Sequence, residues 1–431
     1  MKYVIVIPDG AADRPISHLN GLTPLEAARA PNLSRLAAMG QQGTVRTTPP
    51  GFTAGTDVCC LSLLGYDPAK YHTGRAPLEA AALGIAPGLQ DWVFRVNLVT
   101  TTEDSGPGQD DGMMLDHSAG QITDGEARAL IASLVEYWGR TEPDLAQQFS
   151  LHAGVSYRNI LIDKSQRDYR GSIGGKDRLT TYPPHEIPRK AWRKFLPRGE
   201  HSDVLKRLME RSRECFSRHE VNAARREAGL RVASMAWVWG QGTRPALPMF
   251  AERFGVRGCV TTAVDLMAGI VAYAGLDRIA APGLTSYDDN DYAAQGRYSI
   301  AGLERYDLVV VHVKSPDEAS HQGDFEGKIA AIESIDAHVI GPMLAELQGR
   351  YGVPGPGWRM LVAPDHYTLC ETMKHDATPP PFVIAGTGVK AMGRAGMTEA
   401  HAEAAGLHVE PGESLMEYFL FGGMKRDGAA A

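Results

Sequence analysis

The sequence predicts an α/β protein built around a mainly parallel sheet. Short runs rich in β-branched and aromatic residues recur along the 431-residue chain, and Ala- and Leu-rich stretches of helical character lie between most of them. Strands that are apolar throughout are typical of parallel sheets covered by helices on both faces. The predicted strands are Tyr3–Ile7, Trp92–Val99, Asn159–Ile162, Arg231–Trp239, Leu308–Val313, Met360–Ala363 and Phe382–Ala385.

One segment, residues 121–230, interrupts this alternation. We interpret it as an α+β substrate-binding domain inserted into a discontinuous core formed by residues 1–120 and 231–431, with hinges near Gly120 and Arg231. Its expected features, in order, are a helix over Gly125–Trp138, a strand, a Gly- and Pro-containing middle over Gly171–Pro188 and a charged helix over Ser202–His219.

Charge is distributed unevenly along the chain. The net charge of −7 argues against a general affinity for nucleic acid. Residues 121–230 nevertheless hold 20 of the 44 Lys and Arg residues and 15 of the 51 Asp and Glu residues, a local net charge of +5 that leaves −12 for the remainder. An acidic body joined to a basic segment suits a small anionic substrate, although surface charge also varies along any long chain.

Cysteine usage and hydropathy indicate the compartment. The five cysteines form no CxxC pair, which fits a reducing environment better than a disulfide framework. The apolar start, Tyr3–Ile7, is too short for a secretory signal, and no run approaches the roughly 18 apolar residues of a membrane span. We therefore expect a cytoplasmic protein without a membrane partner, and the sequence leaves its oligomeric state open.

Acidic residues follow three of the predicted strands. Asp9, Asp317 and Asp365 each come just after an apolar run, and in open α/β sheets ligands gather beyond the carboxyl ends of the strands. Asp317 and His321 are four residues apart, so on a helical turn they share a face, although such pairs are also common on protein surfaces. An acidic residue at the end of a buried strand is costly unless it is paired or bound to a metal.

His366 and His375 add imidazoles to these carboxylates, and Thr56 adds a hydroxyl. By itself His375 is an ordinary loop histidine, and only the whole set of residues indicates a metal site. Mixed carboxylate and imidazole ligands suit Mn²⁺ or Zn²⁺ better than Ca²⁺. Two such ions can clamp the attacking and leaving oxygens of a phosphoryl transfer. The set therefore predicts an enzyme that acts on phosphate esters.

Thr56 has two possible roles, because it precedes a predicted helix over Val58–Gly65. A hydroxyl residue in a Gly-Thr-Asp sequence would ordinarily cap that helix by accepting a backbone N–H. Alternatively, Thr56 is a nucleophile whose hydroxyl is ionised by a metal, with helix N–H groups receiving phosphate oxygens. Only the presence of the other candidate ligands elsewhere in the chain favours the role of nucleophile.

Six longer motifs occur in order between residues 8 and 242 of the chain. They are PDGAADRP at 8–15, PPGFTAGTD at 49–57, LSLLGYDP at 61–68, TGRAPLEAA at 73–81, FRVNLVT at 94–100 and WGQG at 239–242. This set resembles the archaeal type of cofactor-independent phosphoglycerate mutase, within the alkaline phosphatase superfamily. The resemblance implies an alkaline-phosphatase-like core with a mainly parallel sheet, an inserted substrate domain that closes as a lid, two divalent metal ions, and no 2,3-bisphosphoglycerate.

The resemblance also implies roles for individual residues. The implied ligands are Asp317, His321 and His375 for one ion, and Asp9, Asp365, His366 and the nucleophile Thr56 for the other. We expect Mn²⁺, with Zn²⁺ and Mg²⁺ as alternatives. The implied contacts to a small phosphorylated anionic substrate are Arg75, Arg95, Arg158 and His185. A guanidinium fork matches planar anions, although a surface ion pair is the ordinary role of an arginine.

The implied activity is that of an isomerase in glycolysis and gluconeogenesis, which interconverts 3-phosphoglycerate and 2-phosphoglycerate through a phosphothreonine. One departure is that the family carries Ser where this chain has Thr56, and the extra methyl stiffens χ1 and crowds the site. The substrate therefore stays open. The rivals are a related metal-dependent phosphotransferase such as a homoserine kinase, a phosphatase or phosphodiesterase, and a non-catalytic sensor of a phosphorylated metabolite.

Overall fold

The computed structural model describes residues 1–102, 112–171, 177–393 and 396–422, and the chain forms two compact units. Unit 1 comprises Met1–His72 and Ala246–Ala431, and unit 2 comprises Thr73–Pro245. The core is therefore discontinuous, as the sequence predicts. The predicted boundaries, which placed the insertion at 121–230, are wrong at both ends.

Strand pairing explains why the insertion is longer than expected. Strand β3 (Trp92–Thr101) pairs with β7 (Met235–Thr243) along most of its length, so both strands belong to unit 2. The predicted hinges also lie inside unit 2. There Arg231 Nη1 donates to Asp116 Oδ2 at 3.0 Å, and the Arg225 guanidinium donates to the carbonyl of Gly120 at 3.4 Å.

The centre of unit 1 is an eight-stranded, mainly parallel sheet, as predicted. Strand β1 lies between β10 and β11 and runs parallel to both, and among the described residues only the two pairings of β14 are antiparallel. In spatial order the strands are β15 (His408–Val409), β2 (Gly40–Val45), β14 (Pro381–Gly386), β11 (Trp358–Val362), β1 (Lys2–Pro8), β10 (Leu308–Val313), β8 (Gly258–Thr261) and β9 (Asp277–Arg278).

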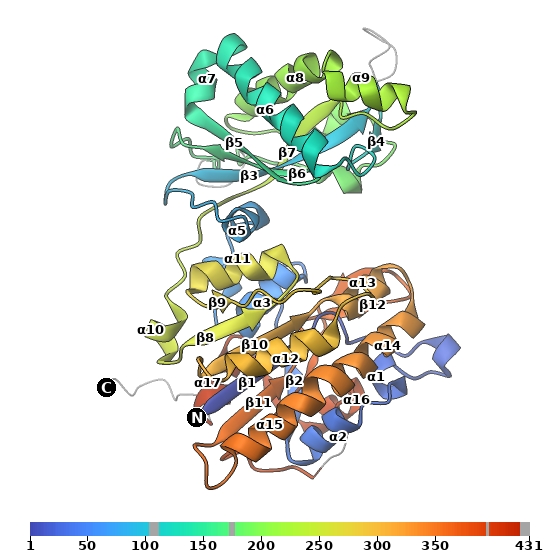
Figure 1. Cartoon of the computed structure of the whole chain (residues 1–431), viewed down its shortest axis with the longest axis vertical. Helices are drawn as coiled ribbons and strands as arrows, with labels where there is room; N and C mark the ends of the chain where they lie inside the picture. The colour runs from blue at the N-terminus through green and yellow to red at the C-terminus, as the bar shows by residue number, and fades with distance from the viewer. Residues whose placement is uncertain (103–111, 172–176, 394–395, 423–431) are drawn as a thin grey trace. The chain divides into compact units, whose positions relative to one another are not determined.

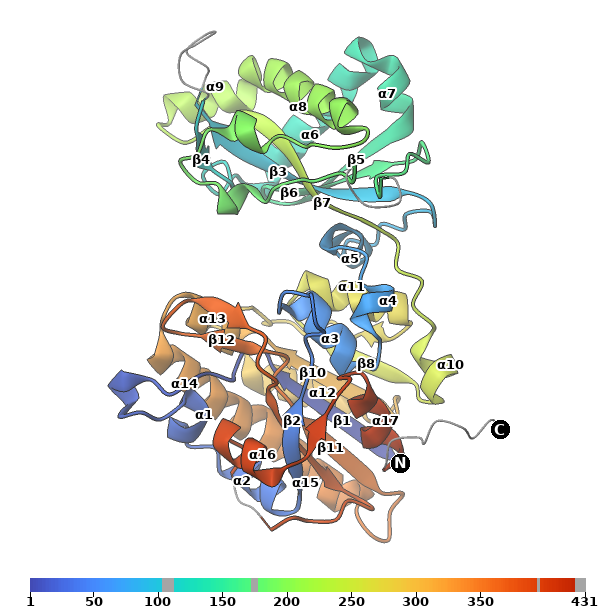
Figure 2. The same ribbon diagram turned by 180° about the vertical axis from the view of Figure 1, so that it is seen from behind.

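Helices cover both faces of this sheet, which is why its central strands are apolar throughout. Val4 and Val6 point to one face and Ile5 and Ile7 to the other, and all four are fully buried. One face packs against α2 (Pro31–Ala38), α12 (Tyr292–Gly302), the π-helical turn η4 (Asp336–Ile340) and α15 (Gly341–Tyr351) (Figure 1). The view from behind shows α3 (Thr56–Leu63), α16 (Glu399–Ala405) and α17 (Ser414–Phe421) (Figure 2).

The remaining helices of unit 1 are short or lie at its rim. They are α1 (Pro24–Ala27), α4 (Pro68–Tyr71), α10 (Phe250–Phe254), α11 (Asp265–Ala274), α13 (Ser315–His321) and α14 (Phe325–Ile335), together with the 3-10 turn Ser17–Leu19. A two-stranded hairpin, β12 (Tyr367–Leu369) and β13 (Lys374–Asp376), follows β11.

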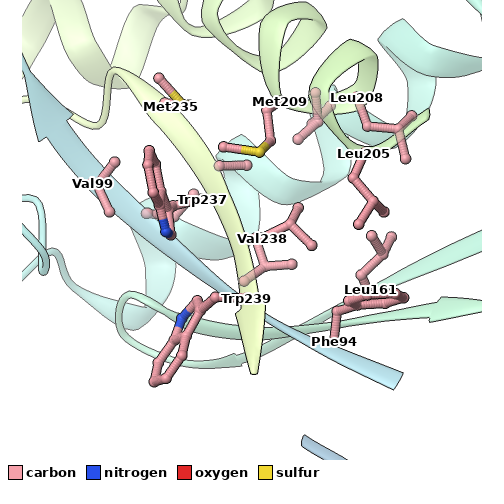
Figure 3. Close-up of a cluster of buried hydrophobic side chains, with 14 of the residues drawn as sticks. Phe94, Val99, Leu161, Leu205, Leu208, Met209, Met235, Trp237, Val238 and Trp239 are labelled. Carbon is pink, nitrogen blue, oxygen red and sulfur yellow. The ribbon is translucent and has the colours of Figure 1, made fainter. Parts of the chain in front are cut away.

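Unit 2 is an antiparallel sheet with its own core. Strand β3 pairs with β7, with β6 (Arg158–Asp163) and with β4 (Met114–Asp116), and β6 pairs with β5 (Phe149–Val155). Val238 of β7 points towards Phe94 and Leu161, and Trp237 lies beside Val99 on the other side of the strand, as Figure 3 shows; all belong to one buried cluster with apolar residues of α8. Its helices are α5 (Arg75–Ala82), α6 (Asp124–Thr141), α7 (Pro143–Gln148), α8 (Ser202–Ser217) and α9 (Glu220–Glu227), with 3-10 turns at Pro184–Glu186 and Trp192–Phe195.

Helix α5 packs on the opposite face of the unit 2 sheet. Its residues Ala76 and Ala80 contact Val93 of β3 and Ile160 and Ile162 of β6. This placement keeps Arg75, at the start of the helix, in the same unit as Arg95 and Arg158. Across the described ranges of both units, we find no helix with the length and apolarity that crossing a bilayer requires.

Candidate metal centre, nucleophile and anion-binding cluster

The sheet of unit 1 brings the predicted metal ligands to one edge. Asp9 directly follows β1, Asp317 lies on α13 just beyond β10, and Asp365 lies three residues beyond β11. Because β1 is parallel to both neighbours, the carboxyl ends of the three strands meet. The β12–β13 hairpin then turns back, so His375 pairs with Thr368 beside the same edge.

One group of potential ligands surrounds Asp317. Its atoms and those of His366 and His375 lie within 4.8 Å of one another. His375 Nε2 lies 3.2 Å from Asp317 Oδ1, and His321 Nε2 lies 3.3 Å from Asp317 Oδ2. The two Nε2 atoms of His321 and His375 are 2.9 Å apart. Because two imidazole nitrogens face each other and one carboxylate, the group fits a cation better than it fits a closed hydrogen-bond network.

A second group comprises Asp9, Asp365 and His366, all fully buried. Asp365 Oδ1 accepts the backbone N–H groups of Gly10 at 3.0 Å and His366 at 3.1 Å. Its other oxygen, Oδ2, lies 3.2 Å from His366 Nε2, which is also 3.6 Å from Asp9 Oδ1. His366 therefore belongs to both groups.

His366 supplies the clearest test of whether the site fits a metal. Within the described part of the chain, its buried Nε2 has no hydrogen-bond partner. Burial first, and then the neighbouring His375, lowers the pKa of His366 to about 3, so its imidazole is neutral at pH 7. A neutral, unpartnered imidazole nitrogen set between carboxylates is costly by itself and suits a divalent cation. The residues present therefore fit a metal.

Lys314, whose side chain is 11% exposed, is a cation of the site that was not predicted from the sequence. Its Nζ lies 2.5 Å from Asp317 Oδ2 and 3.2 Å from Asp9 Oδ2. Burial disfavours the charged form of Lys314 and would lower its pKa. The carboxylates of Asp317 and Asp9 have a larger combined effect and raise the pKa of Lys314. Burial would likewise raise the pKa of Asp9, but Lys314 and His312 together outweigh it and lower that pKa. Lys314 stands three residues before Asp317 at a strand end, and this spacing was the available signal.

Asp365 shows that one lysine does not balance the cluster. Burial, and then the charge of Asp9, raises the pKa of Asp365 well above its ordinary value. Three buried aspartates, Asp9, Asp317 and Asp365, share the single ammonium of Lys314. The excess of negative charge favours binding of further cations.

The structure contradicts the capping role for Thr56. Gly55 is the N-cap residue of α3, and no side chain caps that helix. The Thr56 hydroxyl instead donates to Asp9 Oδ2 at 3.1 Å and accepts a hydrogen bond from Lys314 Nζ at 3.2 Å. Thr56 is 4% exposed, so its hydroxyl faces the ligand groups rather than solvent. Its catalytic role remains a prediction that this geometry supports.

The four predicted substrate contacts all lie in unit 2. Arg75 begins α5, Arg95 lies on β3, Arg158 begins β6 and His185 lies in the 3-10 turn Pro184–Glu186. Arg158 pairs with Asn97, two residues beyond Arg95, across the two strands. Burial lowers the pKa of Arg95, and the charge of Glu79 opposes this shift. The positive charges of Arg75 and Arg158 lower the pKa of Arg95 further. Arg95 and Arg158 lie on the paired strands β3 and β6, and Arg75 begins the helix that packs on these strands, so we call the three arginines the cationic cluster.

Aromatic residues hold this cluster in place, and the sequence analysis did not assign them. The Arg95 guanidinium lies 4.0 Å from the ring centre of Trp239, and its Nε is 2.9 Å from Glu79 Oε2. The His185 ring packs 5.4 Å from Trp239. Trp239 Nε1 donates to Asn97 Oδ1 at 2.9 Å, which fixes the indole. Asn97 and Trp239 stand in two of the six motifs, so their positions were visible but their partners were not.

His185 differs from the arginines in charge. Loss of solvent around the ring, followed by the charge of Arg95, lowers the pKa of His185 to about 4. The ring of His117 lies 6.0 Å away and acts in the same direction. At pH 7 His185 is therefore neutral and offers one hydrogen-bond donor and one acceptor rather than a positive charge.

A mainly parallel α/β sheet with a buried carboxylate–imidazole cluster and a hydroxyl at its carboxyl edge defines an alkaline-phosphatase-like fold that carries candidate metal-ligand groups. A sequence profile described as 2,3-bisphosphoglycerate-independent phosphoglycerate mutase matches residues 37–222. A protein of Methanothermobacter thermautotrophicus named 2,3-bisphosphoglycerate-independent phosphoglycerate mutase 2 is 43% identical over 392 residues, covering 91% of this chain and 90% of its own. This chain belongs to the 2,3-bisphosphoglycerate-independent phosphoglycerate mutase family.

Solved structures agree on the fold. A protein from Pyrococcus horikoshii, 26% identical, superposes with a TM-score of 0.79 and covers 99% of both chains. A cofactor-independent phosphoglycerate mutase from Thermoplasma acidophilum, 24% identical, superposes with a TM-score of 0.63 over 97% of this chain and 99% of that one. The predicted fold class is therefore confirmed.

Proposed function

We propose that this enzyme is an isomerase that moves a phosphoryl group between the 3- and 2-hydroxyl groups of glycerate, with Thr56 as the nucleophile. The observation that carries the proposal is the position of the Thr56 hydroxyl. It is buried, bonded to Asp9 at 3.1 Å and set among the carboxylates and imidazoles of the two ligand groups. The family of the chain supplies the substrate class.

The reaction takes two phosphoryl transfers. In the first, Thr56 Oγ1 forms a bond to phosphorus as the bond from phosphorus to the 3-oxygen of 3-phosphoglycerate breaks. The proton of Thr56 leaves along its hydrogen bond to Asp9 Oδ2 and is delivered to the leaving 3-oxygen, which becomes a hydroxyl. In the second, the 2-hydroxyl attacks the phosphothreonine, the bond between phosphorus and Thr56 breaks, and the proton of the 2-hydroxyl passes to Thr56 Oγ1.

Lys314 supplies fixed positive charge at the reacting oxygen. Its Nζ lies 3.2 Å from Thr56 Oγ1, so it favours the ionised hydroxyl and the charge that develops on the transferring group. Because Asp317 and Asp9 hold the ammonium, it needs no reorganisation during the reaction. The site is therefore preorganised for transfer to and from Thr56.

We assign two divalent ions to the two ligand groups. Asp317, His321 and His375 would hold one, and Asp9, Asp365, His366 and Thr56 the other. When bound, such ions lower the pKa of a coordinated hydroxyl and neutralise the phosphoryl oxygens. The imidazoles favour Mn²⁺ or Zn²⁺ over Mg²⁺, and we propose Mn²⁺. The chemistry needs no 2,3-bisphosphoglycerate, because Thr56 itself carries the phosphoryl group between the two hydroxyls.

We assign the anionic end of the substrate to the cationic cluster of unit 2. Arg75, Arg95 and Arg158 would bind carboxylate or phosphate oxygens, and the neutral His185 would bond a hydroxyl of glycerate. Retention of glycerate between the two transfers is what separates a mutase from a phosphatase. The lid movement of the insertion, the cytoplasmic location and the place in glycolysis stay predictions from the sequence.

A ³¹P NMR time course with 3-phosphoglycerate and Mn²⁺ tests the proposal. We expect the 2-phosphoglycerate resonance to grow to an equilibrium mixture. Accumulation of inorganic phosphate instead would indicate a phosphatase, and binding without turnover would indicate a sensor. A parallel reaction with homoserine and a phosphoryl donor tests the kinase alternative. Any of these last three results without 2-phosphoglycerate would overturn the mutase assignment.

A further inference from the structure

A buried histidine outside both ligand groups contacts Asp9, which belongs to the second ligand group and accepts the hydrogen bond of the Thr56 hydroxyl. His312 lies on β10 and pairs in register with Ile7 of β1, two residues before Asp9. It is 1% exposed, and its Nε2 lies 3.0 Å from Asp9 Oδ2. On the other side of the ring, Nδ1 lies 3.0 Å from Thr262 Oγ1.

The partners of His312 determine its tautomer. An ionised carboxylate only accepts hydrogen bonds, so the Nε2 that faces Asp9 must carry hydrogen. In the neutral ring Nδ1 is then an acceptor, and the Thr262 hydroxyl must donate to it. Thr262 is suited to this, because its oxygen already accepts the backbone N–H of Val264 at 3.0 Å. The carbonyl of His312 accepts Gln295 Nε2 at 2.9 Å, which holds the backbone.

The two carboxylate oxygens of Asp9 therefore have different partners. Oδ2 receives His312 Nε2–H at 3.0 Å and the Thr56 hydroxyl at 3.1 Å. Oδ1 faces His366 Nε2 at 3.6 Å, within the second ligand group. A rotation of the carboxylate would exchange these two roles, and the hydrogen bond from His312 opposes it.

We propose that His312, oriented by Thr262, is a positioning residue that fixes the rotation of Asp9 and so sets both the metal geometry and the approach of Thr56. Thr262 follows β8, His312 lies on β10 and Asp9 follows β1, and these strands are neighbours in the sheet. The polar chain thus runs across three adjoining strands to the nucleophile. Outer partners that orient a metal ligand typically change metal affinity or activity about 10–100-fold.

The inference rests on the proposed metal site, so the test measures metal affinity directly. Mn²⁺ binding is titrated by electron paramagnetic resonance, with kcat and KM measured separately. Thr262→Val removes the donor to Nδ1, and Thr262→Ser restores it. The matched control is Thr261→Val on β8, which removes a buried hydroxyl pair with Ser299, 2.9 Å long, that does not reach His312.

We expect Thr262→Val to weaken Mn²⁺ binding and lower kcat about tenfold each, with KM little changed. Thr262→Ser and Thr261→Val should match the wild type in both properties. His312→Leu should lose about 100-fold, and His312→Gln, which keeps an N–H donor, should recover part of that loss. Equal Mn²⁺ affinity and kcat in Thr262→Val and the wild type would overturn the inference. Failure of the wild type to bind Mn²⁺ would instead overturn the proposed function and, with it, the inference.

Discussion

Units 1 and 2 gather their charged side chains in different ways. In unit 1, Asp9, Asp317, Asp365 and His366 are fully buried and stand at the ends of adjoining strands. In unit 2, the arginines come from a helix start and two strands, Arg158 is exposed, and Arg95 is held by side-chain contacts with Glu79 and Trp239. The backbone of the sheet sets the first arrangement, and side-chain packing sets the second.

This difference has a consequence for substitutions. A ligand at a strand end has no alternative position, and its loss leaves other buried charges without a partner. A cationic cluster shares its charge among several side chains, so losing one of them weakens binding without abolishing it. We therefore expect substitution of a ligand in unit 1 to abolish activity and substitution of an arginine in unit 2 to reduce activity only in part.

Removal of metal should have the largest effect. Exhaustive chelation should abolish turnover, and Mn²⁺ should restore it better than Mg²⁺, because three histidines contribute imidazole nitrogens. Activity is followed by coupled assay and metal content by elemental analysis. Full turnover of a chelated protein in which no metal is found would contradict the proposed centre.

A single ligand change should come next. Asp317→Asn removes the charge that faces His321, His375 and Lys314, and we expect one ion to be lost and kcat to fall by more than about 100-fold. Asp336→Asn is the matched control, because Asp336 is a buried aspartate of unit 1 that accepts the N–H of Leu33 at 2.6 Å. The control should lower the melting temperature and keep full metal content. Equal metal content in both variants would argue against Asp317 as a ligand.

Arg95→Lys should reduce activity in part rather than abolish it. Loss of the fork costs the free energy of a charged hydrogen bond, about 1.5–3 kcal/mol, so KM should rise about 10–100-fold with metal content unchanged. Arg128→Lys serves as the control, because Arg128 is an exposed arginine of the same unit that pairs with Asp124 at 3.1 Å. A KM for Arg95→Lys equal to that of the control would remove the cluster from substrate binding.

Trp239→Phe should have the smallest effect. It leaves the buried Oδ1 of Asn97 without the indole N–H, which costs about 1–3 kcal/mol of unfolding free energy. The phenyl ring still faces Arg95, so KM should rise only a few-fold. Thermal unfolding and steady-state kinetics measure the two quantities. An unchanged melting temperature would show that the Trp239–Asn97 bond does not stabilise unit 2.

The same contrast explains what the sequence could predict. The strand ends of unit 1 were predictable because apolar runs followed by Asp have few other interpretations, and the structure brings Asp9, Asp317 and Asp365 together as expected. The insertion boundaries were not, because β3 and β7 are apolar strands like those of the core, and only their pairing assigns them to unit 2. His312 was not predicted because a single His within an apolar strand carries no pattern of its own, and Lys314 could be recognised only by its spacing from Asp317 beyond the end of β10.

The nucleophile is the central claim, and rapid quenching during turnover tests it most directly. With 3-phosphoglycerate and Mn²⁺, mass spectrometry of the quenched wild-type protein should find phosphate on Thr56. Thr56→Ser should carry it on the new hydroxyl and stay active, and Thr56→Ala should carry none and fall to background activity with its fold intact. A Thr56→Ala protein that still interconverts the phosphoglycerates, or a turning-over wild type with phosphate on another residue, would contradict the account.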